Sequence, residues 1–280
     1  MSHREDGQAI RKALRILSLF VSAGGPMRAK EIVETLGISF PTASRILGIL
    51  EEEGFLSRDP HSKEYALGPR AYYLGLVAEQ QFQFKKIALP FLERLRDETG
   101  ETANLYLLDG LERVCIAQAE SRYSLRRSAQ IGERFPLWAG ASGRCFLAFA
   151  KDLKLVVEAL SSSYQMTPNT ITDFRTMIEL LEETRRKGFA ASSGEREIGV
   201  SSIAAPVFDA TGVVCASVAL SGPSQRFGPE KALTFTERVI GTAAELSAKL
   251  GLKSRRWPPE EVLKDLPDLR QLLDRTERQD

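Results

Sequence analysis

Apolar residues recur at helical spacing in three short stretches near the start of the chain. The first covers positions 9–21, with basic residues on its other side and Ile10, Leu14, Ile16, Leu17 and Phe20 as its apolar set. The next two lie within positions 29–50 and are separated by only a few residues. Since a 3.6-residue period marks an amphipathic helix, the pattern predicts three helices, the first bracing the other two.

The break between the second and third helices has the chemistry of a tight turn. Gly37 stands where the chain must leave the second helix with positive φ. Ser39 is placed as an N-cap, and Pro41 falls in the first turn of the third helix, where its missing N–H costs nothing. This arrangement is typical of a helix-turn-helix, although any two amphipathic helices joined by a glycine satisfy most of it.

The spacing of residues in the third helix predicts a polar face opposite its apolar face. Its back is formed by Ala43, Ile46, Leu47 and Leu50. The other face offers short hydrogen-bonding groups and a forked cation, which suit base edges and phosphates. We therefore expect a DNA major groove to receive Ser39, Phe40, Thr42, Ser44 and Arg45.

Two short alternating runs, FLSRD and EYALG, follow the third helix and are separated by the turn-rich PHSK. They predict a hairpin, which in this position is a wing. Arg58, His61 and Lys63 lie on or beside its tip, where they would touch phosphates or the minor groove. A solvated hairpin tip is the alternative. The expected domain is a winged helix-turn-helix over residues 1–69.

The remaining chain predicts an α+β domain. After helical spacing over 68–83 and 85–98, the period changes to two in ETANLYLLD and RVCIAQAE, and again in VSSIAAPVFD and VVCASVALSG. Extended chain is also expected over 124–138, and helices over 143–151, 153–160, 173–187 and 229–250. Antiparallel strands with helices segregated around them give this fold class. We assign 70–84 to a linker helix, 85–250 to the domain and 251–280 to an extension that packs back, contacts another copy or stays disordered.

Composition narrows the function classes. The 280 residues carry 38 basic and 37 acidic side chains, and residues 1–70 are close to neutral, so a DNA interface must rest on geometry and not on a basic footprint. Three distant cysteines and two histidines offer no disulfide framework, metal site or catalytic base. No run approaches a membrane span and the polar start is no secretory signal. We expect a cytoplasmic protein without membrane, metal, cofactor or enzymatic activity.

Several stretches resemble the IclR family of bacterial transcriptional regulators. They are the bracing helix, the turn GISFPTASRIL, the wing, GERFPLWAGASGRCFLAF and, most specifically, GEREIGVSSIAAPVFDATGVVCASVALSGPSQRF. The resemblance spans roughly residues 8–250. It implies an N-terminal winged helix-turn-helix, a C-terminal GAF-like domain that binds a small metabolite, and assembly as a dimer or a dimer of dimers.

An effector site can be sought where small residues precede a helix. Residues 139–143 are small and lead into the segment containing Cys145, and free N–H groups at a helix start suit an anion. Close packing of the helix start on the sheet is the alternative. By the resemblance, ligand contacts fall on Ala141, Ser142, Ser192, Ser202, Ala219 and Ser221.

Three of these positions depart from some family members. Ser192 replaces an acid, Ser202 a cysteine and Ala219 a serine, which predicts a less charged pocket. Trp138 adds a large flat side chain, either a pocket wall or simply core, and a wall of this kind favours an aromatic or otherwise apolar organic acid.

The function that follows is a sequence-specific DNA-binding regulator controlled by a small organic-acid effector and acting as a homo-oligomer on an operator. The alternative is a small-molecule-binding or enzymatic α+β domain whose helical head makes protein contacts. The polar face with Thr42 and Arg45, together with the wing, favours the regulator, because protein docking requires neither. Repressor and activator are not distinguished by these features.

Overall fold

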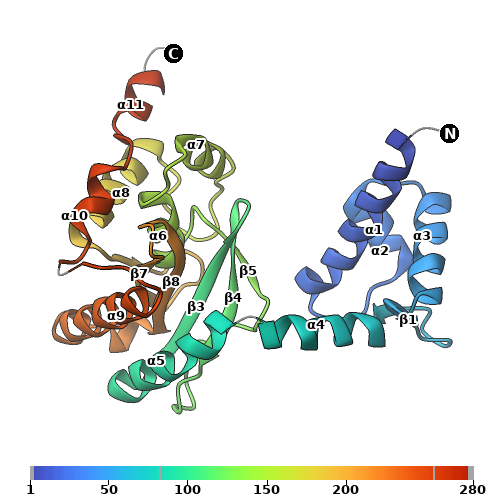
Figure 1. Ribbon diagram of the computed structural model, residues 1–280, viewed down its shortest axis with the longest axis horizontal. Helices are drawn as coiled ribbons and strands as arrows, with labels where there is room; N and C mark the ends of the chain where they lie inside the picture. Colours follow the sequence, from blue (N-terminus) through green and yellow to red (C-terminus); the bar gives the residue numbers. More distant parts are fainter. Residues whose placement is uncertain (1–2, 82, 255, 277–280) are drawn as a thin grey trace. The chain divides into compact units, whose positions relative to one another are not determined.

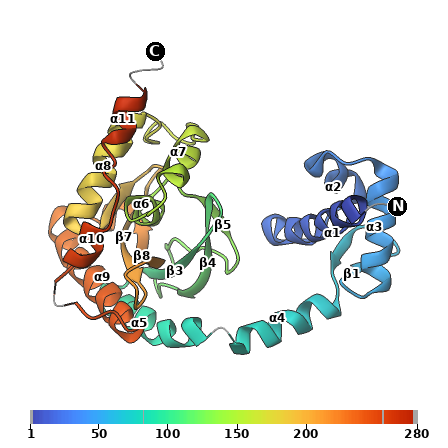
Figure 2. The ribbon, with the colours of Figure 1, turned by 45° about the horizontal axis from the view of Figure 1, so that its top comes forward.

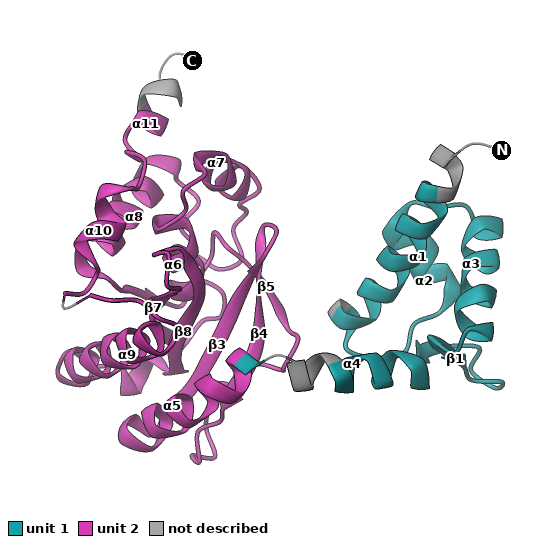
Figure 3. Ribbon diagram, in the orientation of Figure 1, with its two compact units in different colours: residues 1–83 teal, residues 84–280 magenta. Residues whose placement is uncertain are grey.

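The computed structural model describes residues 3–81, 83–254 and 256–276 and divides into two compact units, residues 1–83 and 84–280 (Figure 3). Residues 1–2, 82 and 277–280, which fall in the segments predicted as the DNA-binding domain, linker helix and extension, lie outside the described part, as does residue 255. The segment predicted as a separate linker belongs largely to the first unit.

The first unit is the winged helix-turn-helix expected from the sequence. Its elements are α1 (His3–Ala23), α2 (Ala29–Leu36), α3 (Phe40–Glu52), β1 (Leu56–Arg58), β2 (Tyr65–Leu67) and α4 (Pro69–Gln81) (Figure 1). Gly37 ends α2 with φ 61°, as the turn chemistry predicted. The antiparallel pair β1–β2 is the wing. A small core joins Ile16 and Phe20 of α1 to Ile32 of α2 and Leu47 of α3.

Not all apolar residues of this unit face its core. Ile10 and Leu14 of α1 are 62% and 58% exposed, so only part of the predicted apolar set braces the other helices. The α4 helix is also apolar at exposed positions, among them Tyr72, Tyr73 and Leu74. Helical spacing predicts that such residues share a face, but not whether the partner of that face lies in the same chain.

The second unit is built on a six-stranded antiparallel sheet in the order β5-β4-β3-β8-β7-β6. The strands are β3 (Thr102–Asp109), β4 (Glu112–Ala119), β5 (Arg134–Pro136), β6 (Ala190–Ser193), β7 (Val200–Phe208) and β8 (Val214–Pro223). The hairpins β3–β4 and β7–β8 are those predicted from the alternating runs. Of the stretch predicted as extended, only the three residues of β5 form a strand.

Helices cover both faces of this sheet (Figures 1 and 2). One face packs on α5 (Gln83–Thr99) and α9 (Pro229–Lys249), through residues such as Leu92, Leu105 and Val239. The other face packs on α6 (Ala141–Ala148), which is buried along its whole length. Outside α6 lie α7 (Leu153–Ser161) and α8 (Phe174–Lys187), both N-capped by an aspartate side chain.

The described part of the extension packs back on the second unit. It contains α10 (Glu260–Lys264) and α11 (Gln271–Thr276). Trp257 donates its indole N–H to the Gly188 carbonyl at 3.0 Å and lies against Phe208. Val262 and Leu269 join the core beside α6 and α8. Of the three roles considered for this segment, the structure shows that its described part packs back on its own chain.

Candidate DNA-binding face and effector cavity

The α3 helix presents the polar face that the sequence predicted. Ala43, Ile46, Leu47 and Leu50 are buried, whereas Ser39, Ser44 and Arg45 are exposed and Phe40 is 57% exposed. Thr42 is half-buried, and its hydroxyl lies 2.9 Å from that of Ser39. Ser39 therefore has the backbone geometry of an N-cap, but its hydroxyl bonds to Thr42 and does not cap the helix. Arg45 has no ion pair or hydrogen bond within the described residues, so its guanidinium is available.

The tip of the wing is an ordered turn. One carboxylate oxygen of Asp59 accepts the backbone N–H groups of His61 and Ser62 at 2.8 and 2.7 Å, and these bonds lower the pKa of Asp59. Lys63 adopts φ 61° beside it. Arg58 stacks over the Tyr65 ring at 5.3 Å. The basic side chains predicted for the wing are thus exposed on a structured hairpin.

The second unit contains a cavity of about 50 Å³ between α6, the sheet and two loops. The loops are the β4–β5 loop (residues 120–133) and the β6–β7 loop (residues 194–199). Five of the seven residues predicted for the effector site line this cavity: Ser142, Ser192, Ser202, Ala219 and Ser221. The separate stretches of sequence that carry them are brought together by the sheet and by the start of α6.

Three of the lining serines form a row across adjacent strands. Ser192 of β6 is the cross-strand partner of Ser202 of β7, and Ser202 is the partner of Ser221 of β8. Their side chains share one face of the sheet, since directly opposed residues project to the same side. The floor of the cavity is therefore a line of hydroxyl groups, each able to donate and accept.

Trp138 and Ala141 are not among the residues that line the cavity. Trp138 is 2% exposed and packs edge-on against Tyr164, with ring centroids 4.9 Å apart. Of its two possible positions, pocket wall and core, it therefore occupies the core. Ala141 is 1% exposed, while its neighbours Gly140 and Ser142 line the cavity. The aromatic wall on which the preference for an aromatic ligand rested is thus not part of the cavity.

The cavity also has charged side chains in its lining, beside the serines that the resemblance indicated. Five charged side chains join the lining: Arg113, Arg127, Arg196, Glu195 and Glu197. Apart from Arg113 on β4, they come from the β4–β5 and β6–β7 loops, which carry no periodic pattern and so gave no signal in the sequence. The run GEREIG, quoted for the resemblance, contains three of them, but nothing in the run indicates which side chains point inward.

Most of these charges are already neutralised or bonded. Glu195 pairs with Arg144 at 2.8 Å, and Arg127 pairs with Glu197 at 3.1 Å. Arg113 donates to the carbonyls of Pro136 and Ala139 and is 2% exposed. Burial, aided by the nearby charge of Arg196, lowers the pKa of Arg113 to about 9. Arg113 therefore remains a cation at neutral pH and holds the chain before α6.

Arg196 differs from the other lining cations. Its guanidinium lies 3.8 Å from the centroid of the Phe135 ring, yet it makes no hydrogen bond or ion pair with any described residue. Burial lowers its pKa without removing its charge at neutral pH. Tyr106 also lines the cavity, and its hydroxyl has no hydrogen-bond partner in the described chain. Burial raises the pKa of Tyr106 to about 12, so it is a neutral donor. The Arg196 guanidinium and the Tyr106 hydroxyl are thus two donors without a partner, and this favours an anionic ligand.

The start of α6 already holds an anion supplied by the chain. The Gly140 N–H donates to Glu195 at 2.9 Å, and the other oxygen of this carboxylate accepts from Arg144. A Cβ at Gly143 would overlap the Leu137 carbonyl, so this glycine permits close packing of the helix start. Both interpretations of the small-residue stretch thus have support: it packs closely, and one of its N–H groups binds a carboxylate.

Three further observations limit what the protein can do. No three His, Cys, Asp or Glu residues of the described chain gather as a metal site. Burial raises the pKa of the Cys115 and Cys145 thiols to about 12, so neither is a thiolate at neutral pH. Among the described helices, none has the length and apolar character needed to cross a bilayer.

The fold and site together define a class of protein: a winged helix-turn-helix, a type of fold that binds DNA, followed by an α+β unit with an internal polar cavity. The sequence profile "IclR helix-turn-helix domain" matches residues 9–60, and "Bacterial transcriptional regulator IclR C-terminal" matches residues 78–248. The chain belongs to the IclR family of bacterial transcriptional regulators.

Relatives match over most of their length. The HTH-type transcriptional repressor AllR of Escherichia coli K12 is 29% identical over 252 residues, 90% of this chain and 93% of AllR. The crystal structure of an IclR regulator from Alicyclobacillus acidocaldarius has a TM-score of 0.77 and 32% identity, covering 86% of this chain and 98% of that chain. The crystal structure of Thermotoga maritima IclR has a TM-score of 0.64 and 33% identity, covering 87% of this chain and 99% of that chain.

Proposed function

We propose that this regulator reads an operator through α3 and the wing, and that a small organic anion bound in the cavity controls it. The exposed polar face of α3, which carries the unpaired Arg45, supports the DNA interface. The unpaired Arg196 beside the row of serines supports the effector class. No catalytic role is proposed, and the cytoplasm, where the operator lies, is the expected location.

The observation that carries the effector proposal is Arg196. A carboxylate accepting from its guanidinium and from the Tyr106 hydroxyl would satisfy both groups, and the serine hydroxyls would bond the rest of a polar ligand. A cavity of about 50 Å³ is small beside the roughly 300–1,000 Å³ of most small-molecule sites. We therefore propose a small organic acid, and infer that an aromatic acid enters only if the surrounding loops move.

The unpartnered apolar residues of α1 and α4 support assembly of two copies through the first unit. A single winged helix-turn-helix has little affinity by itself, and two half-sites require two copies. We propose a homodimer, or a dimer of dimers, on a two-fold operator.

The DNA proposal is tested by comparing two substitutions. Arg45→Ala should weaken operator binding by about 1–3 kcal/mol, because it removes a base-reading or phosphate-binding fork. Lys63→Ala in the wing should weaken all DNA sequences alike and flatten the slope of affinity against salt by about one unit. Mobility-shift titrations at several salt concentrations measure both effects. Unchanged operator affinity in Arg45→Ala would remove α3 from the groove.

The effector proposal is tested by calorimetry with acetate, butyrate and benzoate. Arg196→Ala should lower the affinity for whichever acid binds wild type by about 10–100-fold, because a charge-assisted bond is lost. Arg186→Ala, an exposed arginine on α8, is the matched control and should bind normally. Ser142→Phe should fill the cavity and abolish binding while leaving operator binding intact. An Arg196→Ala protein with wild-type affinity would place the anion elsewhere.

A further inference from the structure

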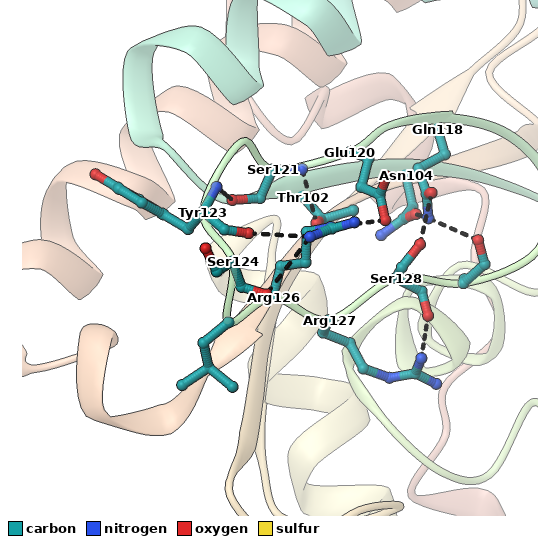
Figure 4. Close-up of polar contacts among 12 residues, drawn as sticks. Thr102, Asn104, Gln118, Glu120, Ser121, Tyr123, Ser124, Arg126, Arg127 and Ser128 are labelled. Carbon is teal, nitrogen blue, oxygen red and sulfur yellow. Dashed lines mark hydrogen bonds and ion pairs between the residues drawn. The ribbon is translucent and has the colours of Figure 1, made fainter.

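A chain of neutral side chains runs from the floor of the cavity to the β4–β5 loop. Ser128 of this loop donates its hydroxyl to Gln118 Oε1 at 3.0 Å, and Gln118 Nε2 donates to Asn104 Oδ1 at 2.8 Å (Figure 4). Asn104 Nδ2 then lies 3.1 Å from the Ser221 hydroxyl oxygen. The chain crosses β4, β3 and β8 in turn, and its last member lines the cavity.

The direction of every bond in this chain is fixed by one carbonyl. Gln118 Nε2 also lies 2.8 Å from the Ala129 carbonyl, which can only accept, so this end of the amide must be the NH₂ group. Gln118 Oε1 must then accept from Ser128, and Asn104 must turn its oxygen toward Gln118 and its NH₂ toward Ser221. All donors therefore point the same way, from the loop to the cavity.

This polarity leaves one group free at the cavity end. Ser221 accepts from Asn104, so its own O–H is available to donate to a ligand oxygen. Asn104 is 0% exposed and stands among the apolar residues of β3, where a buried amide must keep its partners. Aligned hydrogen bonds polarise one another, so an acceptor placed on Ser221 strengthens each bond back to Ser128.

The loop end of the chain is also part of the cavity. Arg127, next to Ser128, lines the cavity and forms its 3.1 Å ion pair with Glu197 of the β6–β7 loop. At the start of the loop, the Ser121 N–H donates to the Thr102 hydroxyl (Figure 4), and the Ser121 hydroxyl donates to the Gly100 carbonyl. Gln118 fastens this loop to the sheet through Ser128 and Ala129.

We propose that Asn104 and Gln118 are positioning residues that transmit occupancy of the cavity to the β4–β5 loop. This inference rests on the proposed function for the identity of the occupant as an organic anion. An oxygen of that anion accepts from Ser221. The hydrogen bonds of the relay, which runs from Ser221 through Asn104 and Gln118 to Ser128, then strengthen, and the β4–β5 loop closes against the β6–β7 loop. Neither Asn104 nor Gln118 lines the cavity, so their part is to couple the ligand to the loop.

The relay can be tested in the free protein by hydrogen exchange of residues 120–133. Ser221→Ala and Ser128→Ala should each raise exchange in this loop about 5-fold, the effect of losing one hydrogen bond. Because both changes break one chain, the double variant should stay near 5-fold instead of reaching about 25-fold. Ser202→Ala is the matched control: it changes the neighbouring serine of the row, which has no bond to the relay, and should leave the loop unchanged.

Equal loop exchange in Ser221→Ala and Ser202→Ala, or a double variant near 25-fold, would overturn the relay. Unchanged exchange of α9 in each variant checks that the unit remains folded. A second arm adds the acid that binds wild type at saturation. It should slow loop exchange in wild type. Ser221→Ala loses one bond to the acid and should bind it more weakly, but at a concentration that saturates the variant its loop should not slow. If none of the three acids binds, the effector proposal fails, while the free-protein result still decides the relay.

Discussion

Arg144 and Glu195 form an ion pair in which both side chains are almost fully buried, at 2% and 5% exposure. The pair closes the start of α6, because Glu195 also accepts the Gly140 N–H and Arg144 also donates to the Ala191 carbonyl. Each charge is compensated on all sides within the described structure. A buried charge that loses its partner is costly, so this pair is a sensitive point of the unit.

Glu195→Gln should destabilise the second unit by about 3–5 kcal/mol, since it keeps the shape of the side chain but leaves Arg144 uncompensated. Glu197→Gln is the control. Glu197 is 57% exposed, and a surface pair such as Arg127–Glu197 contributes at most about 1 kcal/mol. The loss of stability in each variant is measured by urea unfolding, with hydrogen exchange of α6 as the probe. Similar losses in the two variants would contradict the structural role given to the buried pair.

The turn between α2 and α3 depends on one backbone conformation. Gly37 has φ 61°, and a Cβ built there would meet no atom within 4 Å. Substitution therefore costs only the backbone penalty of the left-handed region.

Gly37→Ala should lower the stability of the helix-turn-helix by about 1–2 kcal/mol, seen as roughly 5–30-fold faster hydrogen exchange in α2 and α3 of the full chain. Gly37→Asn should cost less, because asparagine adopts positive φ more readily than alanine. If alanine proved as good as glycine, the turn would have to rearrange, and the geometry of α3 on DNA would no longer follow from this structure.

The elements could be predicted from the sequence where periodicity was strong. The helices of the first unit, the wing and both long hairpins lie where the apolar spacing placed them, and the resemblance placed the serines of β6, β7 and β8. Arg127 and Arg196 could not be found, because loop residues follow no period and their direction depends on contacts with distant strands. Trp138 was ambiguous for another reason: a large apolar side chain beside a helix start suits a core and a pocket equally well.

The exposed apolar face of α1 gives a prediction about the assembled molecule. In sedimentation experiments wild type should be a dimer or tetramer, and Leu14→Glu should shift it toward smaller species and weaken operator binding, because a charge would be buried in the contact between copies. Leu233→Glu, at a leucine of α9 that is 66% exposed, is the control and should leave the assembly unchanged. A wild-type monomer that bound its operator tightly would exclude this arrangement.

The relay from Ser221 to Ser128 is made only of hydroxyl and amide groups, and none of these titrates across the range of pH that a cell experiences. Acidification or a change in ionic strength therefore leaves its bonds and their direction intact. DNA contacts behave differently, because affinity for phosphates falls steeply as salt rises. The relay would thus carry its signal through neutral hydrogen bonds, whereas the operator is held by charge. A rise in salt would weaken binding to DNA and leave the bonds of the relay in place.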